Sequence, residues 1–145
     1  MKGLLTLARL EPTERSLALR TLLLVAVVRV ALWFVPFERV RSFARSSNRL
    51  PFSVSREISI RKLVWAVKAA SRRIPWASCL TQSVALHSLL LRGGHDSQIH
   101  IGVAKEPKTG FEAHAWVEHA GQPLLSSPSE LYRYTRLVTL EEERI

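Results

Sequence analysis

The chain has 145 residues, a formal net charge of +9 and a hydrophobic fraction of 47%. This length fits one domain with enough apolar side chains for a core, and it argues against several domains. The single cysteine, Cys79, excludes an internal disulfide and is typical of a reducing cytoplasm. Charged residues interrupt the apolar start of the chain too early for a secretory signal.

The positive charge is concentrated in the first half of the chain. Residues 1–73 hold 15 Lys/Arg against 4 Asp/Glu, a net charge of +11, whereas residues 74–145 have a net charge of −2. A basic segment of this kind suits an acidic peptide, a partner protein, nucleic acid or an anionic membrane, or it is simply a solvated helix face. Its aromatic residues fall mainly on apolar faces rather than on an exposed platform, so we expect no nucleic-acid binding.

The first predicted element is a helix over residues 14–35, which Pro36 ends. Arg29 lies inside its apolar run, where a charge in a bilayer costs about 2.5–3.5 kcal/mol. We therefore expect this helix to be buried, to face a partner or to associate with a membrane without spanning it. The protein is expected to be cytoplasmic and able to lie near a membrane.

A short basic helix over residues 37–43 and a linker over residues 46–53 are predicted next. This composition divides the chain into a basic, apolar helical segment, residues 1–50, and a main domain, residues 51–145.

The main domain begins with two predicted helices. The first covers residues 59–70 and has an apolar stripe at helical spacing. The second starts after Ser78, a favourable N-cap, and runs to Leu91 or Arg92, where Gly93-Gly94 ends it. Its nearly unbroken apolar sequence predicts a central, buried helix.

After the second helix the apolar period changes from helical to two, which predicts strands. Residues 99–103 form the first strand, and residues 111–118 form the second after a turn at residues 107–110. Ala120-Gly121 is a plausible hairpin turn into residues 122–127. The chain from Pro128 is expected to be a polar tail.

Cys79 and His114 are the candidate catalytic pair. Cys79 falls at the first position of the buried helix, where the helix dipole favours a thiolate and the first-turn N–H groups can bind an oxyanion. His114 falls on the second strand, 35 residues later. A thiol at a helix start and an imidazole on a following strand are the nucleophile and base of many cysteine enzymes. A lone cysteine at a helix start is otherwise a small buried hydrophobic residue.

A metal site is not expected, and neither is a cofactor. The other histidines are His87, His95, His100 and His119. No pair among these residues and Cys79 shows the close C-x-x-C or H-x-x-x-H spacing that zinc sites usually use.

Four short runs resemble, in order, the lasso peptide leader peptidases, which are transglutaminase-like cysteine peptidases. They are Ala77–Leu90 with the cysteine, Gly93-Gly94, Ile101-Gly102-Val103, and Gly110–Glu118 with the histidine. The resemblance covers about residues 58–127. It implies an α+β fold with a transglutaminase- or papain-like core, in which the cysteine helix packs on a small antiparallel sheet that bears the histidine, preceded by N-terminal helices.

The resemblance also implies a function. Cys79 is the nucleophile, and His114 is the base that later protonates the leaving amine. The substrate is a ribosomal precursor peptide whose leader is removed, so that an ATP-dependent cyclase can close the macrolactam. A small leader-binding protein, called a RiPP recognition element, presents the precursor leader to the protease. This chain resembles the stand-alone protease half.

The third catalytic position departs from the family pattern. An Asp or Glu about a dozen residues after the histidine usually orients the imidazole, but Ser126 and Ser127 stand there. Hairpin pairing across Ala120-Gly121 brings His114 opposite Ser127. A serine can hold the imidazole through a neutral hydrogen bond. The alternatives are a simple dyad, or an acid from elsewhere such as Asp96 or Glu112.

Two further functions compete with the peptidase. The same Cys/His pair serves other acyl transfers, such as transglutamination or amide hydrolysis. A non-catalytic binding module would instead use the basic half for docking and leave the thiol inert.

Overall fold

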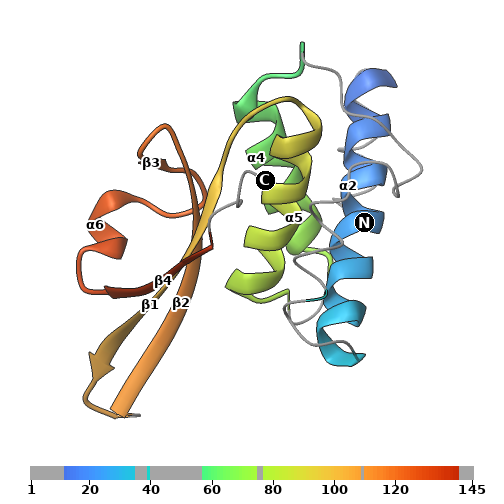
Figure 1. The fold of residues 1–145 in the computed structure, drawn as a ribbon. Helices are drawn as coiled ribbons and strands as arrows, with labels where there is room; N and C mark the ends of the chain where they lie inside the picture. Colours follow the sequence, from blue (N-terminus) through green and yellow to red (C-terminus); the bar gives the residue numbers. More distant parts are fainter. Residues whose placement is uncertain (1–11, 35–38, 40–56, 75–76, 109, 141–145) are drawn as a thin grey trace.

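In the computed structural model, which describes residues 12–34, 39, 57–74, 77–108 and 110–140, three helices lie beside an antiparallel sheet. The helices stand on one side of the sheet and a short fourth helix, α6, on the other (Figure 1). The elements in chain order are α2 (Pro12–Phe34), α4 (Ile60–Ser71), α5 (Cys79–Arg92), β1 (Gln98–Glu106), β2 (Gly110–His119), β3 (Gln122–Pro123), α6 (Pro128–Leu131) and β4 (Thr135–Leu140). This arrangement confirms the predicted α+β fold.

The ends of α5 follow the local chemistry of its sequence. Ser78 has extended backbone angles, and its side chain accepts a hydrogen bond from the Thr81 N–H, as an N-cap does. At the other end Gly94 adopts a φ of +79°, a left-handed conformation that glycine reaches without steric cost. Both predicted ends of this helix are confirmed.

The hydrophobic core lies between the three helices and one face of the sheet. Most of α5 is buried, which confirms its predicted central place. α2 contributes Leu24, Val25 and Val28, and α4 contributes Leu63 and Val67. Ile99 of β1 and Val117 of β2 close the core from the sheet side.

The sheet has the order β3-β2-β1-β4, with every pair antiparallel. Ala120 and Gly121 form the hairpin turn between β2 and β3 and both have positive φ, of 52° and 77°. His119 pairs with Gln122 across this turn, as predicted. β3 has only two residues in its ladder, so the outer edge of β2 is covered over a short stretch.

The chain after Pro128 is more than the polar tail predicted from the sequence. A capping box between Ser127 and Glu130, with Pro128 in the first turn, starts α6. β4 then adds to the free edge of β1.

The returning chain, which is the segment from Pro128 that carries α6 and β4, also changes the burial of the sheet. His100 is 1% exposed and Trp116 is 3% exposed, although both lie on the face away from the helices. The centre of the sheet is therefore buried on both faces.

Two predicted segments of the N-terminal half lie largely outside the described residues. The linker at residues 46–53 is not described, and neither is the boundary near residue 50. Of the short basic helix at residues 37–43, only Arg39 is described, and it is helical.

Within the described part of the chain, α2 passes the length and hydropathy test for a membrane-crossing helix. About 28% of its most apolar window is buried in the structure. Leu24 and its buried neighbours pack against α4 and α5, so one face of α2 belongs to the domain core. The same length and composition also occur in a core helix, so this finding alone does not make α2 a spanning helix.

The packing of α2 gives a matched pair of substitutions. Leu24 is 3% exposed and its neighbour Leu23 is 57% exposed. Leu24→Ala should lower the free energy of unfolding by about 2–5 kcal/mol, because it leaves a cavity in the core. Leu23→Ala should change it by less than about 0.5 kcal/mol. Urea denaturation of both variants measures the difference, and equal effects would show that α2 is not part of the core.

Candidate active site

Cys79 occupies the first position of α5 and is partly exposed. Its sulfur accepts a hydrogen bond from the Ala115 N–H, with an N···S distance of 3.5 Å. The cysteine and the residue after His114 are thus brought together across 36 positions of sequence. The thiol therefore lies beside one edge of β2, which is the strand that carries His114.

The pairing of β2 explains why this amide is available. The carbonyl of Val117 accepts from the Leu124 N–H at 3.0 Å, so this edge of β2 faces β3 at Val117. In a strand the N–H and C=O groups two residues apart point to the same edge, so the Ala115 N–H also points there. β3 has left the ladder at that level, and the Cys79 sulfur takes the place of a strand partner.

His114 contacts Ser126 through its Nε2 atom, at 3.0 Å from the Ser126 Oγ. Since Nε2 is engaged by the hydroxyl, Nδ1 is the nitrogen that remains to exchange a proton with the thiol. Ser126 thus lies where an orienting residue of a Cys–His–X triad lies.

Ser127, the other candidate for the orienting position, has a different place. Its hydroxyl accepts from the Glu130 N–H and its own N–H donates to the Glu130 carboxylate, so it is the N-cap of α6. Strict continuation of the hairpin would have placed Ser127 opposite His114. The chain leaves the ladder after β3, and Ser126 reaches the imidazole instead.

Of the two acidic alternatives, Glu112 has another side-chain partner. Glu112 receives a hydrogen bond from Arg133 at 2.7 Å. The backbone carbonyl of Asp96 contacts the His119 ring.

The aromatic surroundings of His114 were not predicted from the sequence. The Tyr134 ring stacks on the imidazole with a centroid distance of 5.1 Å, and the Trp116 ring stacks at 6.2 Å. Tyr134 belongs to the returning chain, which looked like a polar tail. One residue, Gly102, is a sequence signal for this close packing. A Cβ at this position would lie 3.0 Å from the Trp116 ring and 2.9 Å from the Thr135 carbonyl. A glycine within a strand often marks such a close approach.

Glu118 holds the Trp116 indole in place. One carboxylate oxygen accepts from the indole N–H at 3.1 Å and from Arg136 at 3.0 Å. The other lies 3.1 Å from Nε2 of the buried His100. Because both oxygens are engaged, Glu118 supports the Trp116 ring next to His114 rather than His114 itself.

Burial lowers the pKa of His114 from its ordinary value. The negative charges of Glu112 and Glu130 oppose this shift, and the positive charge of Arg133 adds to it. The neutral imidazole, which is the form that accepts a proton, is therefore favoured at neutral pH.

Among the residues that the structure describes, no group of three or more His, Cys, Asp or Glu side chains could hold a metal ion.

The side chains gathered around Cys79 suit nucleophilic catalysis: a thiol, an imidazole to move its proton, and a hydroxyl to orient the imidazole. The first N–H groups of α5 have no partner within the helix, and a helix N-terminus favours negative charge, so this end of α5 suits the binding of an oxyanion. The Thr81 N–H is excepted, because it donates to the Ser78 hydroxyl.

Comparison with known families agrees with this geometry. The family model of the transglutaminase-like superfamily matches residues 14–139, and the chain belongs to this superfamily. The superfamily includes Cys/His acyl-transfer enzymes. None of the curated proteins and none of the solved structures compared with the chain matches it.

The two serines provide a direct test of the third position. Ser126→Ala should lower the Cys79-dependent hydrolysis of an activated ester, such as p-nitrophenyl acetate, by at most about tenfold, the effect of one neutral hydrogen bond. Ser127→Ala should leave the rate unchanged and lower the free energy of unfolding by about 1 kcal/mol through the lost cap. Ester kinetics and urea denaturation of both variants measure this. A thousandfold loss in Ser126→Ala would mean that the hydroxyl does more than orient His114.

The electrostatic surroundings of His114 predict the direction of three pKa changes. The imidazole should titrate below about 6.5, the ordinary value for histidine. Glu112→Gln should lower its pKa further, because it removes a nearby negative charge, and Arg133→Gln should raise it. NMR titration of the His114 ring, in a Cys79→Ala background, measures all three. A pKa above the ordinary value in the parent would contradict the effect of burial.

Proposed function

We propose that this chain is a cysteine peptidase that removes the leader from a ribosomally made lasso precursor peptide. The observation that carries the proposal is the contact of the Cys79 sulfur with the Ala115 amide, next to a His114 whose other side is held by Ser126. Membership of the transglutaminase-like superfamily supports Cys/His acyl transfer in general. The motif around these residues supports the narrower peptidase function.

The reaction follows from the positions of these groups. His114 Nδ1 takes the Cys79 proton, and the thiolate attacks the scissile carbonyl. The first-turn N–H groups of α5 stabilise the oxyanion. The imidazolium then gives its proton to the leaving amine, the C–N bond breaks, and water hydrolyses the thioester. An acyl transferase would use an amine in place of the water, so product analysis separates this second candidate from the peptidase.

Replacing either member of the pair tests the peptidase directly. Cys79→Ala should abolish cleavage of the cognate precursor, and His114→Ala should do nearly the same, because nucleophile and base act as a unit. The circular dichroism of both variants should match that of the parent, since alanine suits both backbone positions. Mass spectrometry of the precursor after incubation measures cleavage. Substantial turnover by either purified variant would refute the assignment.

We further propose that the protease acts in the cytoplasm with a small leader-binding partner and a lasso cyclase, and that α2 contributes to this docking. One face of α2 packs in the core, and its other face exposes an apolar stripe at helical spacing: Leu19, Leu23, Val27, Val30 and Phe34. Arg15 and Arg20 flank this stripe on the helix surface. A contiguous exposed stripe of this kind is typical of a docking surface, and basic residues at its edges suit an acidic partner or an anionic membrane nearby.

The stripe predicts a partner-dependent effect. The chain alone should cleave slowly, and a leader-binding partner should accelerate it by raising the local precursor concentration. Leu23→Gln combined with Val30→Gln should reduce this acceleration by about tenfold or more. It should leave the fold intact, because both side chains are more than half exposed. Phe111→Gln, which changes an exposed apolar residue far from α2, is the control. Unchanged partner-dependent rates in the α2 variant would exclude a docking role for the stripe.

A further inference from the structure

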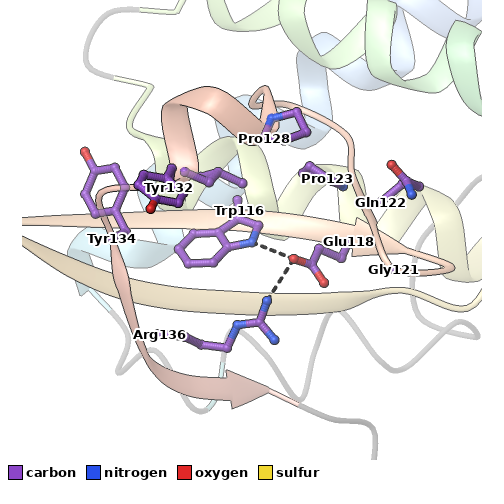
Figure 2. A pocket seen from close by; sticks show the side chains of 10 residues that line it. Trp116, Glu118, Gly121, Gln122, Pro123, Pro128, Tyr132, Tyr134 and Arg136 are labelled. Carbon is purple, nitrogen blue, oxygen red and sulfur yellow. Dashed lines mark hydrogen bonds and ion pairs between the residues drawn. The ribbon is translucent and has the colours of Figure 1, made fainter.

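An open cavity of about 530 Å³ lies on the face of the sheet away from α2, α4 and α5 (Figure 2). Its floor is the Trp116 ring of β2. One wall comes from the β2–β3 hairpin and the other from α6 and the chain that follows it. The side chains that shape it are Trp116, Pro123, Leu131, Tyr132 and Tyr134. A volume of this size lies within the range of sites for small ligands or short peptide segments, about 300–1,000 Å³.

The cavity is suited to an apolar or aromatic group rather than to an ion. Its acidic side chain, Glu118, forms an ion pair with Arg136 at one oxygen, and its other oxygen lies 3.1 Å from Nε2 of His100. The rest of the lining is mainly apolar, with aromatic rings, prolines and Leu131, and it includes one further polar side chain, Gln122. Tyr132 stands at the rim and is 93% exposed, so a ligand would bury a large ring that is now in water.

The cavity adjoins the catalytic histidine. Trp116 and Tyr134, which line it, are the two rings that stack on His114. The Cys79 sulfur lies at the edge of β2, at the start of α5, and bonds to the amide that follows His114. α6 lies across the sheet from α2, α4 and α5 (Figure 1), and its residues Pro128 and Leu131 line the cavity. His114 thus adjoins the cavity through its two stacked rings and neighbours the residue that contacts the thiol.

We propose that this cavity binds a bulky apolar or aromatic side chain in the leaving part of the substrate, within the first residues after the scissile bond. The inference rests on the proposed function. When the C–N bond breaks, the acyl part stays on Cys79 as a thioester, and the leaving amine receives its proton from His114. The leaving amine therefore lies beside the imidazole when the bond breaks, and the two rings that stack on this imidazole line the cavity. The cavity is then a specificity site for the released peptide.

Amine acceptors of known structure test this assignment without the natural precursor. The p-nitrophenyl ester of N-acetylglycine acylates Cys79, and an added amine then competes with water for the thioester. By microscopic reversibility, this amine approaches along the path by which the leaving amine departs. Phenylalaninamide should give at least about tenfold more aminolysis than glycinamide, after correction for the uncatalysed reaction with each amine, because its ring fills the cavity.

Tyr132→Ala should reduce this acceptor ratio at least severalfold, since it removes the rim of the cavity. The ratio is independent of the acylation rate, which cancels between the two amines. Phe111→Ala, at an exposed ring of β2 outside the cavity, is the matched control and should keep the ratio. Equal aminolysis by both amides, or an unchanged ratio in Tyr132→Ala, would overturn the proposal.

A binding measurement separates failure of the cavity from failure of the catalytic assignment. In the Cys79→Ala chain, phenylalaninamide should shift the indole N–H resonance of Trp116, assigned through Trp116→Phe, and glycinamide should not. No shift at saturating phenylalaninamide would overturn the cavity as a binding site. Absence of Cys79-dependent p-nitrophenolate release would instead refute the proposed catalysis, whatever the cavity binds.

Discussion

The hydrogen bond from the Ala115 amide to the Cys79 sulfur is the contact on which the site depends. It exists because the pairing of β2 with the chain after the hairpin ends at Val117, so the Ala115 amide on the same edge donates to the thiol and not to a strand. The start of α5 occupies the gap. A longer β3 would pair with this amide and exclude the thiol from the edge beside the histidine, so the shortness of one strand sets the position of the Cys79 thiol.

The chain after the hairpin completes the site from the other side. Ser126 holds one nitrogen of His114, and Tyr134 stacks on its ring. Trp116 is fixed in turn by Glu118, whose charge is compensated by Arg136. The same segment therefore holds the imidazole, buries part of the far face of the sheet and forms one wall of the cavity. Burial of this kind also lowers the pKa of His114 and favours its neutral form.

Much of this architecture follows from local sequence signals. Ser78 and Gly94 end α5 through cap chemistry that depends on few residues, and Ala120-Gly121 sets the register of its hairpin. Tyr134 and Arg136 could not be placed in the same way, because β4 pairs with β1 over a long stretch of sequence and its polar residues hide the strand. Hairpin arithmetic favoured Ser127 over Ser126 as the partner of His114, since it assumed a regular ladder. The capping box of α6 holds Ser127 and ends that regularity.

The central claim is that Cys79 and His114 form one reactive unit, and the alkylation rate of the thiol tests it most directly. Because the chain has a single cysteine, intact-mass spectrometry after exposure to iodoacetamide reports this one site. At neutral pH, His114→Ala should lower the alkylation rate by at least about tenfold, since the imidazole no longer takes the thiol proton. Equal rates in the parent and in His114→Ala would contradict the account.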